Sequence, residues 1–300
     1  MNKKLFDVAI IGAGVVGASI ARKLSSYNLK VALLEKECDV SFGVSKANSG
    51  IIHGGFHHGS EYLKSKLEVQ GNRMFDQLEQ ELHFPFKRCG IIVAAFSIEE
   101  MKTVEQLYMN GISNKVVGIE MCNQRRMLAL EPKLNTDVVG GLYAPAGGII
   151  EPYRFVFSLV ESALKNGVEL FTNFKVVASA ENSGIYEVTS EMGNTIFSKW
   201  IVNSSGLFAD EISTIFNAEK FEITPRKGEE FLLDRNSAAR TDHVVFPVPD
   251  SVSKGILVIP TVEGTTMLGP TAIPQKSKED VSTTSINLDM VFSSARRMVP

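Results

Sequence analysis

The 300-residue sequence has few cysteines and no long apolar run. Its three cysteines, Cys38, Cys89 and Cys122, lie far apart, and no two of them have the spacing of a zinc site. This usage is typical of a reduced cytoplasmic protein rather than a disulfide framework. No apolar stretch reaches the roughly 20 residues that a membrane-spanning helix needs. We therefore expect a cytoplasmic location without a transmembrane segment, and peripheral contact with the inner face of the membrane stays open.

An excess of charge of one sign is also missing. Lys and Arg number 31 against 34 Asp and Glu, which gives a formal net charge of -3. This balance excludes a dedicated nucleic-acid binder, which would carry a strongly basic face. Hydrophobic residues, in contrast, make up 44% of the chain. A chain of this length and composition can bury the core of one large domain or two ordinary ones.

A glycine motif lies near the N-terminus between expected regular elements. Residues 6–11 have the pattern of a strand, residues 15–27 that of a helix, and residues 30–34 that of a second strand. The motif GAGVVG, from Gly12 to Gly17, occupies the first turn. A strand, glycine turn, helix and strand in this order predict a parallel sheet.

Each glycine of the motif has a separate physical role. Gly12 allows a tight turn, Gly14 lets the backbone approach a pyrophosphate, and Gly17 lets the helix pack closely on the strand. The helix N-terminus presents N–H groups to phosphate oxygens. Glu35, at the end of the second strand, can accept hydrogen bonds from ribose hydroxyls. We therefore predict a dinucleotide site, but NAD and FAD share this fingerprint.

Two later segments are informative. Residues 61–82 carry apolar residues at helical spacing, and we expect this stripe to pack in the core. The stripe consists of Leu63, Leu67, Gly71, Met74, Leu78 and Leu82. Residues 201–206 run from a strand into Gly206, and Asp210 follows in a helical segment. That second glycine turn either approaches the same cofactor from another side or is an ordinary strand-to-helix turn.

The stretch NSGIIHGGFHHGS, residues 48–60, holds three of the five histidines. Its glycines disfavour a helix, and within it no Cys, Asp or Glu completes a ligand set, so we expect no metal site. A generic glycine-rich loop with surface histidines is one alternative. The other is a backbone that passes close to a flat ring, with a histidine placed to take a proton.

The chain resembles the flavoproteins of the D-amino-acid-oxidase superfamily over residues 7–272. Within that group it most resembles the FAD-dependent glycerol-3-phosphate dehydrogenases and oxidases, with the L-2-hydroxyglutarate dehydrogenases close behind. The segments that carry the resemblance are GAGVVG, LLEKE, ANSGIIHGG, LKSKL, KRCGIIVAA, ITPRKGEEFLLD, KGILVIP and LGPTA. The resemblance, and not composition or spacing, favours FAD over NAD.

The resemblance also implies roles for particular residues. His53 matches the family histidine beside the flavin and is the expected catalytic base. Lys254 matches a basic residue by the substrate, and Arg226 lies in a related segment. The residues implied in FAD binding are Gly12, Gly14, Gly17, Glu35, Lys36, Ser45, Asn48, Ser49, Gly50, Val176 and Gly206.

The implied fold is α/β, with a Rossmann-like FAD-binding domain and an interleaved α+β substrate domain on a mostly antiparallel sheet. We expect the FAD-binding domain to comprise residues 1–85 and 150–218, and the substrate domain residues 86–149 and 219–300. Family members continue with a segment that covers the flavin, so we expect the C-terminal part of the fold to be missing here.

The implied activity is oxidation of sn-glycerol 3-phosphate to dihydroxyacetone phosphate by hydride transfer to flavin N5. Oxidation of L-2-hydroxyglutarate or another 2-hydroxy acid is the first alternative. A non-catalytic flavin-binding electron-transfer subunit is the second. The expected partners are a small phosphorylated polyol or hydroxy acid and an electron acceptor. Oxygen, a quinone and an iron–sulfur partner all stay open as that acceptor.

Overall fold

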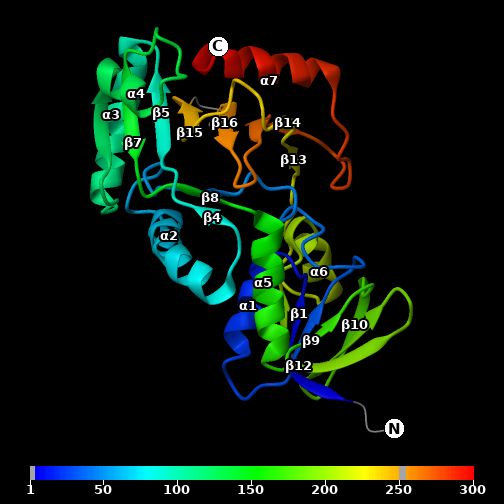
Figure 1. The fold of residues 1–300 in the computed structure, drawn as a ribbon. Helices are drawn as coiled ribbons and strands as arrows, with labels where there is room; N and C mark the ends of the chain where they lie inside the picture. Colours follow the sequence, from blue (N-terminus) through cyan, green and yellow to red (C-terminus); the bar gives the residue numbers. More distant parts are fainter. Residues whose placement is uncertain (1–3, 250–254) are drawn as a thin grey trace. The chain divides into compact units, whose positions relative to one another are not determined.

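The computed structural model describes residues 4–249 and 255–300 (Figure 1). The chain divides into two compact units, each built from segments that are separated in the sequence. The first unit comprises Met1–Asn48, Pro152–Pro225 and Lys276–Lys278. The second unit comprises Ser49–Glu151, Arg226–Gln275 and Glu279–Pro300. No helix among the described residues is both long enough and apolar enough to cross a membrane.

The first unit is built on a six-stranded sheet in the order β10-β11-β12-β1-β2-β9 (Figure 1). Strands β12, β1, β2 and β9 run parallel, whereas β10, β11 and β12 form an antiparallel meander. The strands are β1 (Leu5–Ile11), β2 (Val31–Leu34), β9 (Glu169–Phe171), β10 (Val176–Asn182), β11 (Ile185–Ser190) and β12 (Thr195–Asn203). The helices are α1 (Val15–Leu24), α5 (Pro152–Lys165) and α6 (Ala209–Ile215), with the short 3₁₀ helix η1 (Gly206–Phe208).

Burial explains why the central strands of this sheet are nearly continuous apolar runs. All four residues of β2 are buried, as are five of the seven in β1. Strands covered on both faces lose the alternation of polar and apolar residues, because neither side meets water. Helix α1 contacts both strands and also packs on α5. The sheet therefore fixes the glycine turn at the carboxyl end of β1.

The second unit is built on a seven-stranded sheet in the order β14-β17-β16-β15-β5-β7-β6. Among its described strand pairs, β5 and β15 run parallel and the others antiparallel. The strands are β5 (Ile91–Ala95), β6 (Glu120–Asn123), β7 (Gly140–Ala144), β14 (Phe231–Leu233), β15 (Val244–Pro247), β16 (Leu257–Pro260) and β17 (Thr266–Gly269). The helices are α2 (Leu63–Leu82), α3 (Ile98–Ser113), α4 (Gln124–Leu130) and α7 (Ser285–Met298).

Two faces of this sheet pack against different helices. Ile91 and Val93 of β5 join a core cluster with Leu107 of α3. Their neighbour Ile92 joins a second cluster with Val291 of α7. Successive side chains of a strand point to opposite faces, so the alternation along β5 supplies both layers.

Two small sheets complete the second unit. Strand β8 (Gly148–Ile150) lies between β3 (Ile51–Ile52) and β4 (Phe86–Lys87), antiparallel to both. Strand β13 (Arg226–Lys227) pairs with β18 (Ile273–Pro274). Residues 49–85, which the sequence groups with the cofactor domain, lie in the second unit in this division. The pairing of β3 with β8 places these residues in the second unit. The sequence does not reveal this pairing, because the two strands are far apart in the chain. The assignment of cofactor and substrate binding to separate domains stays a prediction.

The apolar stripe of α2 does not lie in the core, so that prediction is wrong. Leu63 is 68% exposed, Leu67 55% and Met74 54%. The buried residues of the helix are instead Ser65 and Asn72. The face of α2 that packs inward therefore carries Ser65 and Asn72 beside Val69, which packs against a core cluster. Its polar residues supply hydrogen bonds to a loop.

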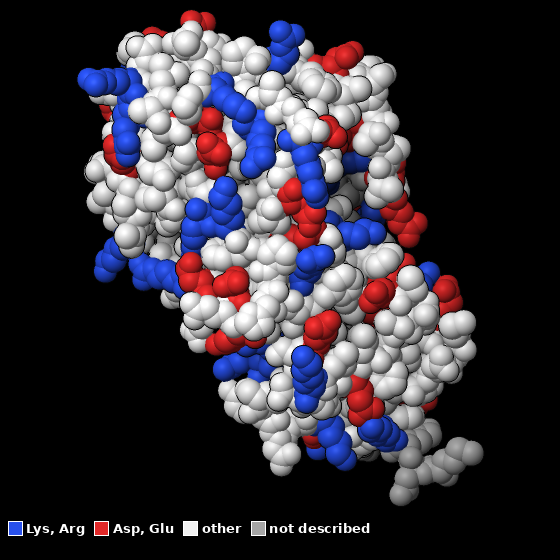
Figure 2. All heavy atoms as spheres, in the orientation of Figure 1, with Lys and Arg blue, Asp and Glu red and all other residues white. Residues whose placement is uncertain are grey.

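Figure 2 shows Lys and Arg interspersed with Asp and Glu over the visible face of the molecule. This mixture agrees with the nearly balanced composition of 31 basic and 34 acidic residues. On this face the charges form no single basic field of the kind that nucleic-acid binding uses.

An ion pair holds the short segment 276–278 to the first unit. Lys278 Nζ lies 2.6 Å from Asp210 Oδ1 and 3.1 Å from Glu211 Oε1 on α6. The hydrogen bond from Lys278 is the main reason that the pKa of Asp210 falls from 3.8 to about 2. Because the folded pKa lies below the unfolded one, this pair stabilises the fold above pH 3.8, and the contribution disappears as the pH falls towards 2.

We expect Lys278→Gln to lower stability at neutral pH but not near pH 2. The lysine stabilises only the charged carboxylate of Asp210, whose pKa in the folded protein is about 2, so most of the stabilisation is lost by that pH. Urea unfolding of wild type and variant between pH 7 and about pH 2 measures the difference. A Lys276→Gln variant serves as the control for loss of charge in the same segment. A stability difference that does not change with pH would contradict this assignment.

Candidate active site

The glycine turn after β1 is packed so closely that two of its glycines are required by the fold itself. Gly12 has φ +100°, and a Cβ there would lie 2.5 Å from the carbonyl oxygen of Ser204. A Cβ on Gly17 would overlap the carbonyl oxygen of Gly12. Both positions therefore exclude a larger residue whether or not a ligand binds.

Gly14 is different, because packing within the protein does not explain it. A Cβ at Gly14 would meet only Ser45 Oγ, at 3.0 Å, and its backbone has φ -75°. As the residue before α1, it provides no side-chain cap, and the first turn of the helix carries no acidic residue. The turn thus leaves backbone space and a positive helix end for an anionic group.

Glu35 lies where an adenosine ribose would be bound in a dinucleotide fold. The residue is 7% exposed, and its carboxylate accepts hydrogen bonds from the N–H groups of Ala13, at 2.8 Å, and Glu37, at 3.0 Å. These bonds hold the carboxylate against the glycine turn. The backbone of Glu35 also bonds Phe171 and Phe174, which brings the start of β10 at Val176 to the same edge.

The segment after β2 returns to the N-terminus of α1. Ser45 Oγ accepts the N–H of Val15 at 2.9 Å, and Ser41 donates its N–H to the carbonyl of Ala13 at 3.1 Å. The structure thus brings Ser45 together with the glycine turn. Asn48, three residues further on, is exposed at the end of this segment.

The second glycine turn lies beside the first. Strand β12 pairs in parallel with β1, and Ser204 Oγ donates to the carbonyl oxygens of Ile11 and Gly12. Gly206 follows with φ +60° and no atom near the position of a Cβ. Lys36 Nζ lies 3.9 Å from the ring centre of Phe208, next to this turn. The first unit therefore gathers Gly12, Gly14, Gly17, Glu35, Lys36, Ser45, Val176 and Gly206 around the ends of β1, β2 and β12.

His53 lies in the second unit, in the loop that connects β3 to α2. We name residues 53–59 of this connection the histidine loop. The His53 ring lies 5.5 Å from that of His57 and 6.1 Å from that of Phe246 on β15, measured between ring centres. His57 stacks on Phe56 at 4.3 Å. His58 turns to a different neighbour, Tyr62.

One face of α2 holds the histidine loop by its backbone. Ser65 Oγ donates to the carbonyl of Gly59, and Glu68 Oε1 accepts the N–H of Gly55 at 2.9 Å. Asn72 Nδ2 donates to the carbonyl of His53 at 2.7 Å. Positions 65, 68 and 72 follow helical spacing, so they share a face. This face explains why α2 buries polar side chains.

A second layer of hydrogen bonds orients Asn72. Its Nδ2 also donates to the carbonyl of Ala146 at 2.9 Å, while Arg88 Nη1 donates to its Oδ1 at 3.0 Å. Arg88 in turn forms a salt bridge with Asp76 at 2.6 Å. Hydrogen bonding from Arg88 lowers the pKa of Asp76. The backbone position of His53 thus depends on a network that ends at the surface.

We expect Asn72→Ala to destabilise the fold by about 1–3 kcal/mol, because two carbonyl groups and Arg88 each lose a partner. Urea or thermal unfolding measures this change. Asn110→Ala is the matched control, since Asn110 makes one exposed side-chain bond to Gln106. A destabilisation by Asn72→Ala no larger than that of the control would show that the network does not hold the loop.

The other predicted residues of the second unit have simple environments. Arg226, on β13, is exposed and donates to the carbonyl of Ala272 at 3.1 Å. Gly50 accepts the N–H of Ile150 through its carbonyl. Ser49 Oγ donates to Glu230 Oε1 at 2.9 Å. Lys254 lies outside the described residues.

Three residues at this site were not identified from the sequence, namely Glu68, Asn72 and Glu230. Burial raises the pKa of Glu230, against the smaller opposite effect of the bond from Ser49. A carboxyl group with a raised pKa is a common feature of functional sites. A signal was present for the helix, because Glu68 and Asn72 are polar residues one turn apart.

A family model described as "FAD dependent oxidoreductase", DAO, matches residues 7–300. The chain belongs to the DAO family of FAD-dependent oxidoreductases. Family membership confirms the prediction of FAD rather than NAD, and with it the predicted α/β fold. The sequence motif alone could not make this choice.

Individual relatives of this DAO-family chain are also named as oxidoreductases. It is 44% identical over 295 residues to a glycerol 3-phosphate dehydrogenase of Caloramator mitchellensis. That alignment covers 98% of this chain and 61% of the relative, so the chain spans less than two thirds of that relative's length. Human mitochondrial L-2-hydroxyglutarate dehydrogenase is 29% identical, over 96% of this chain and 66% of its own length.

A solved structure shares the same fold. The dithionite-reduced L-alpha-glycerophosphate oxidase of Mycoplasma pneumoniae, with FAD bound, superimposes with a TM-score of 0.94 at 30% identity. The match covers 99% of this DAO-family chain and 79% of the oxidase. The first unit fits this cofactor, because Gly14 leaves backbone space at a positive helix end and Glu35 is held beside it. In dinucleotide-binding folds, features of this kind accept a pyrophosphate and an adenosine ribose.

Proposed function

We propose that this protein oxidises sn-glycerol 3-phosphate to dihydroxyacetone phosphate with FAD as its cofactor. The observation that carries the proposal is the 44% identity to a glycerol 3-phosphate dehydrogenase over 98% of this chain. The fold match to a glycerophosphate oxidase supports the same substrate class. The L-2-hydroxyglutarate dehydrogenases are more distant, at 29% identity for the human enzyme.

FAD, when bound, supplies the two-electron acceptor for the hydride that leaves the carbinol carbon of the substrate. The protein must take the remaining hydroxyl proton, so that a C=O bond forms from the secondary alcohol. We assign that proton to the His53 imidazole, since a neutral imidazole has one nitrogen that can accept it. The bond from Asn72 to the His53 carbonyl holds the residue in place for this step.

The residues of the first unit bind the cofactor in this proposal. The N–H groups at the start of α1 receive the pyrophosphate, for which Gly14 provides the close approach. Glu35 accepts hydrogen bonds from the ribose hydroxyls, because the N–H groups of Ala13 and Glu37 hold its carboxylate at the turn. Lys36, Ser45 and Gly206 flank the same turns. The backbone of Val176 would contact the adenine. The family resemblance also implies that Asn48, together with Ser49 and Gly50 of the second unit, lines the path towards the ring.

The negatively charged phosphate of the substrate requires cationic partners. Lys254 and Arg226 are the residues proposed to bind it through charged hydrogen bonds. Arg226 supports this role by its exposure, although one of its N–H groups already bonds Ala272. The two electrons taken from the substrate pass from the reduced flavin to an acceptor. Oxygen, a quinone and an iron–sulfur partner can each fill that role. A small-molecule substrate and an electron acceptor are the partners that the family chemistry requires.

A steady-state assay of the FAD-loaded protein with both alcohols tests the proposal. An artificial electron acceptor removes the question of the natural one. We expect turnover with glycerol 3-phosphate and far less with L-2-hydroxyglutarate. Turnover with hydroxyglutarate and none with glycerol 3-phosphate would overturn the assignment.

A further inference from the structure

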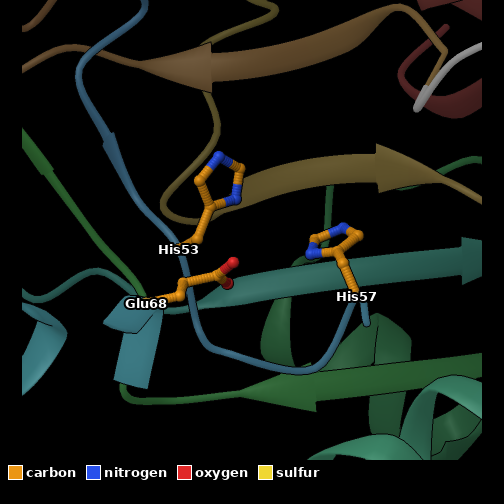
Figure 3. Close-up of side chains that lie close together, drawn as sticks. All are labelled: His53, His57 and Glu68. Carbon is orange, nitrogen blue, oxygen red and sulfur yellow. The ribbon is translucent and has the colours of Figure 1, made fainter. Parts of the chain in front are cut away.

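Two imidazoles and a carboxylate converge beside the histidine loop (Figure 3). His53 and His57 come from the loop itself, and Glu68 reaches them from α2. The ligating atoms of the three side chains all lie within 4.8 Å of one another, and each residue is partly buried. We propose that this cluster binds a divalent transition-metal ion of the zinc type, which blocks His53 and inhibits the enzyme.

The ligand set determines which ion is expected. Two imidazole nitrogens and one carboxylate oxygen form a set that zinc uses with its fourth position open. Magnesium and calcium prefer all-oxygen sets, so they fit this cluster poorly. The expectation of no metal rested on the lack of a carboxylate within residues 48–60. Glu68 lies eight residues beyond that stretch, and the fold brings it back.

The cluster must contract to hold an ion. Zinc bonds to nitrogen and oxygen are about 2.0–2.1 Å long, so tetrahedral ligand atoms lie about 3.3 Å apart. The widest pair, at 4.8 Å or less, therefore closes by at most about 1.5 Å. The χ2 torsion of histidine is broad, so ring rotation supplies part of this movement. Gly54 and Gly55 lie between His53 and His57 in the chain, and their backbone freedom allows the remaining movement.

Contacts outside the cluster already orient its members. The N–H of Gly55 holds Glu68 Oε1 at 2.9 Å, and Asn72 holds the carbonyl of His53 one turn further along α2. His57 is held by stacking on Phe56. Supporting contacts of this kind fix the direction of metal ligands and strengthen binding. The carboxylate keeps its second oxygen for an ion.

Inhibition follows from the chemistry of imidazole, and it rests on the proposed function. A neutral imidazole has one lone-pair nitrogen, so an ion bound there and the substrate proton exclude each other. Binding of the ion itself requires no turnover. The metal site and the proposed function can therefore fail separately.

Isothermal titration of zinc chloride into the purified protein tests the site. His57→Phe removes one ligand but keeps the ring that stacks on Phe56. Glu68→Gln removes the charged ligand but keeps an oxygen that accepts the Gly55 N–H. We expect one zinc ion per chain in wild type and at least about tenfold weaker binding, or 1.4 kcal/mol, in each variant. His58→Phe, in the same loop but outside the cluster, should bind zinc as wild type does.

Cobalt(II) in place of zinc adds a readout of geometry, because its visible absorption reports nitrogen and oxygen ligation. The absorption should appear in wild type and His58→Phe and be lost in the other two variants. Zinc should lower the turnover of wild type and His58→Phe, whereas the turnover of His57→Phe and Glu68→Gln, each compared with its own metal-free rate, should not fall when zinc is added.

Two results would overturn the metal site: no zinc binding to wild type, or equal affinity in wild type, His57→Phe and Glu68→Gln. If these residues bind zinc but glycerol 3-phosphate is not oxidised, the proposed function fails and the site stands. If the substrate is oxidised and the variants bind zinc as wild type does, only the site fails.

Discussion

Replacing His53 by asparagine is expected to lower the rate of flavin reduction by glycerol 3-phosphate by about 10²–10⁴-fold, the usual contribution of a general base. Asparagine cannot accept the hydroxyl proton, so hydride would have to depart from the neutral alcohol and produce a high-energy protonated ketone. FAD content and fold should be unchanged, because the bond from Asn72 reaches the His53 backbone rather than its ring. Stopped-flow absorbance under anaerobic conditions measures the reduction rate directly.

His58→Asn provides the matched control for this prediction. His58 lies in the same loop but contacts Tyr62 rather than the cluster of His53, His57 and Glu68. Its replacement should leave the reduction rate close to that of wild type. A full rate in the His53 variant would remove this residue as the base and favour a structural role for the loop.

A methyl group on Gly14 is expected to weaken FAD binding by about 10–100-fold, or about 1.4–2.8 kcal/mol. The apoprotein should tolerate Gly14→Ala, because the added carbon would meet only Ser45 Oγ at 3.0 Å and the backbone lies at φ -75°. A bound pyrophosphate needs that same space. Fluorescence titration of FAD into the apoprotein measures the affinity, and urea unfolding measures the stability.

Gly71→Ala is the control for an alanine at a tolerant glycine. Gly71 lies within α2, and no atom is within 4 Å of the position of its Cβ. The change should stabilise the protein by about 0.5–1 kcal/mol through the helix preference of alanine, without any effect on FAD affinity. If Gly14→Ala binds FAD as tightly as wild type, the pyrophosphate does not approach at this turn.

Local patterns predicted the strands and the helix around the glycine turn well. Strand β1, the glycine turn, α1 and β2 follow one another in the chain, so their arrangement depends on short-range signals. Glu35 could be found because it ends the strand next to that turn. The mostly antiparallel second sheet also agrees with prediction, since its short strands are separated by glycine and proline.

The orientation of α2 was wrong because periodicity identifies a face but not its neighbour. Leu63 and Leu67 share one face of the helix and are exposed. The side of α2 that packs inward is set by the histidine loop, because the backbone groups of this loop need polar hydrogen-bond partners. Ser65 and Asn72 supply them. A hydrogen-bonding demand of this kind is invisible until the loop is placed in space.

Glu68 and Glu230 could not be identified from the sequence, because only their tertiary contacts distinguish them from other acidic residues. Glu68 approaches His53 through the packing of a helix on a loop, and Glu230 lies 181 positions from its partner Ser49. In the sequence, both look like ordinary surface charges. Their burial and partners emerge only with the fold.

Anaerobic reduction of the bound flavin shows directly whether the protein oxidises glycerol 3-phosphate. The FAD-loaded protein is mixed with sn-glycerol 3-phosphate or with L-2-hydroxyglutarate, and the visible flavin absorbance is followed in the absence of any electron acceptor. We expect rapid and complete bleaching by glycerol 3-phosphate, lost with His53→Asn, and little change with hydroxyglutarate. Bleaching by hydroxyglutarate alone, or by neither alcohol, would contradict it.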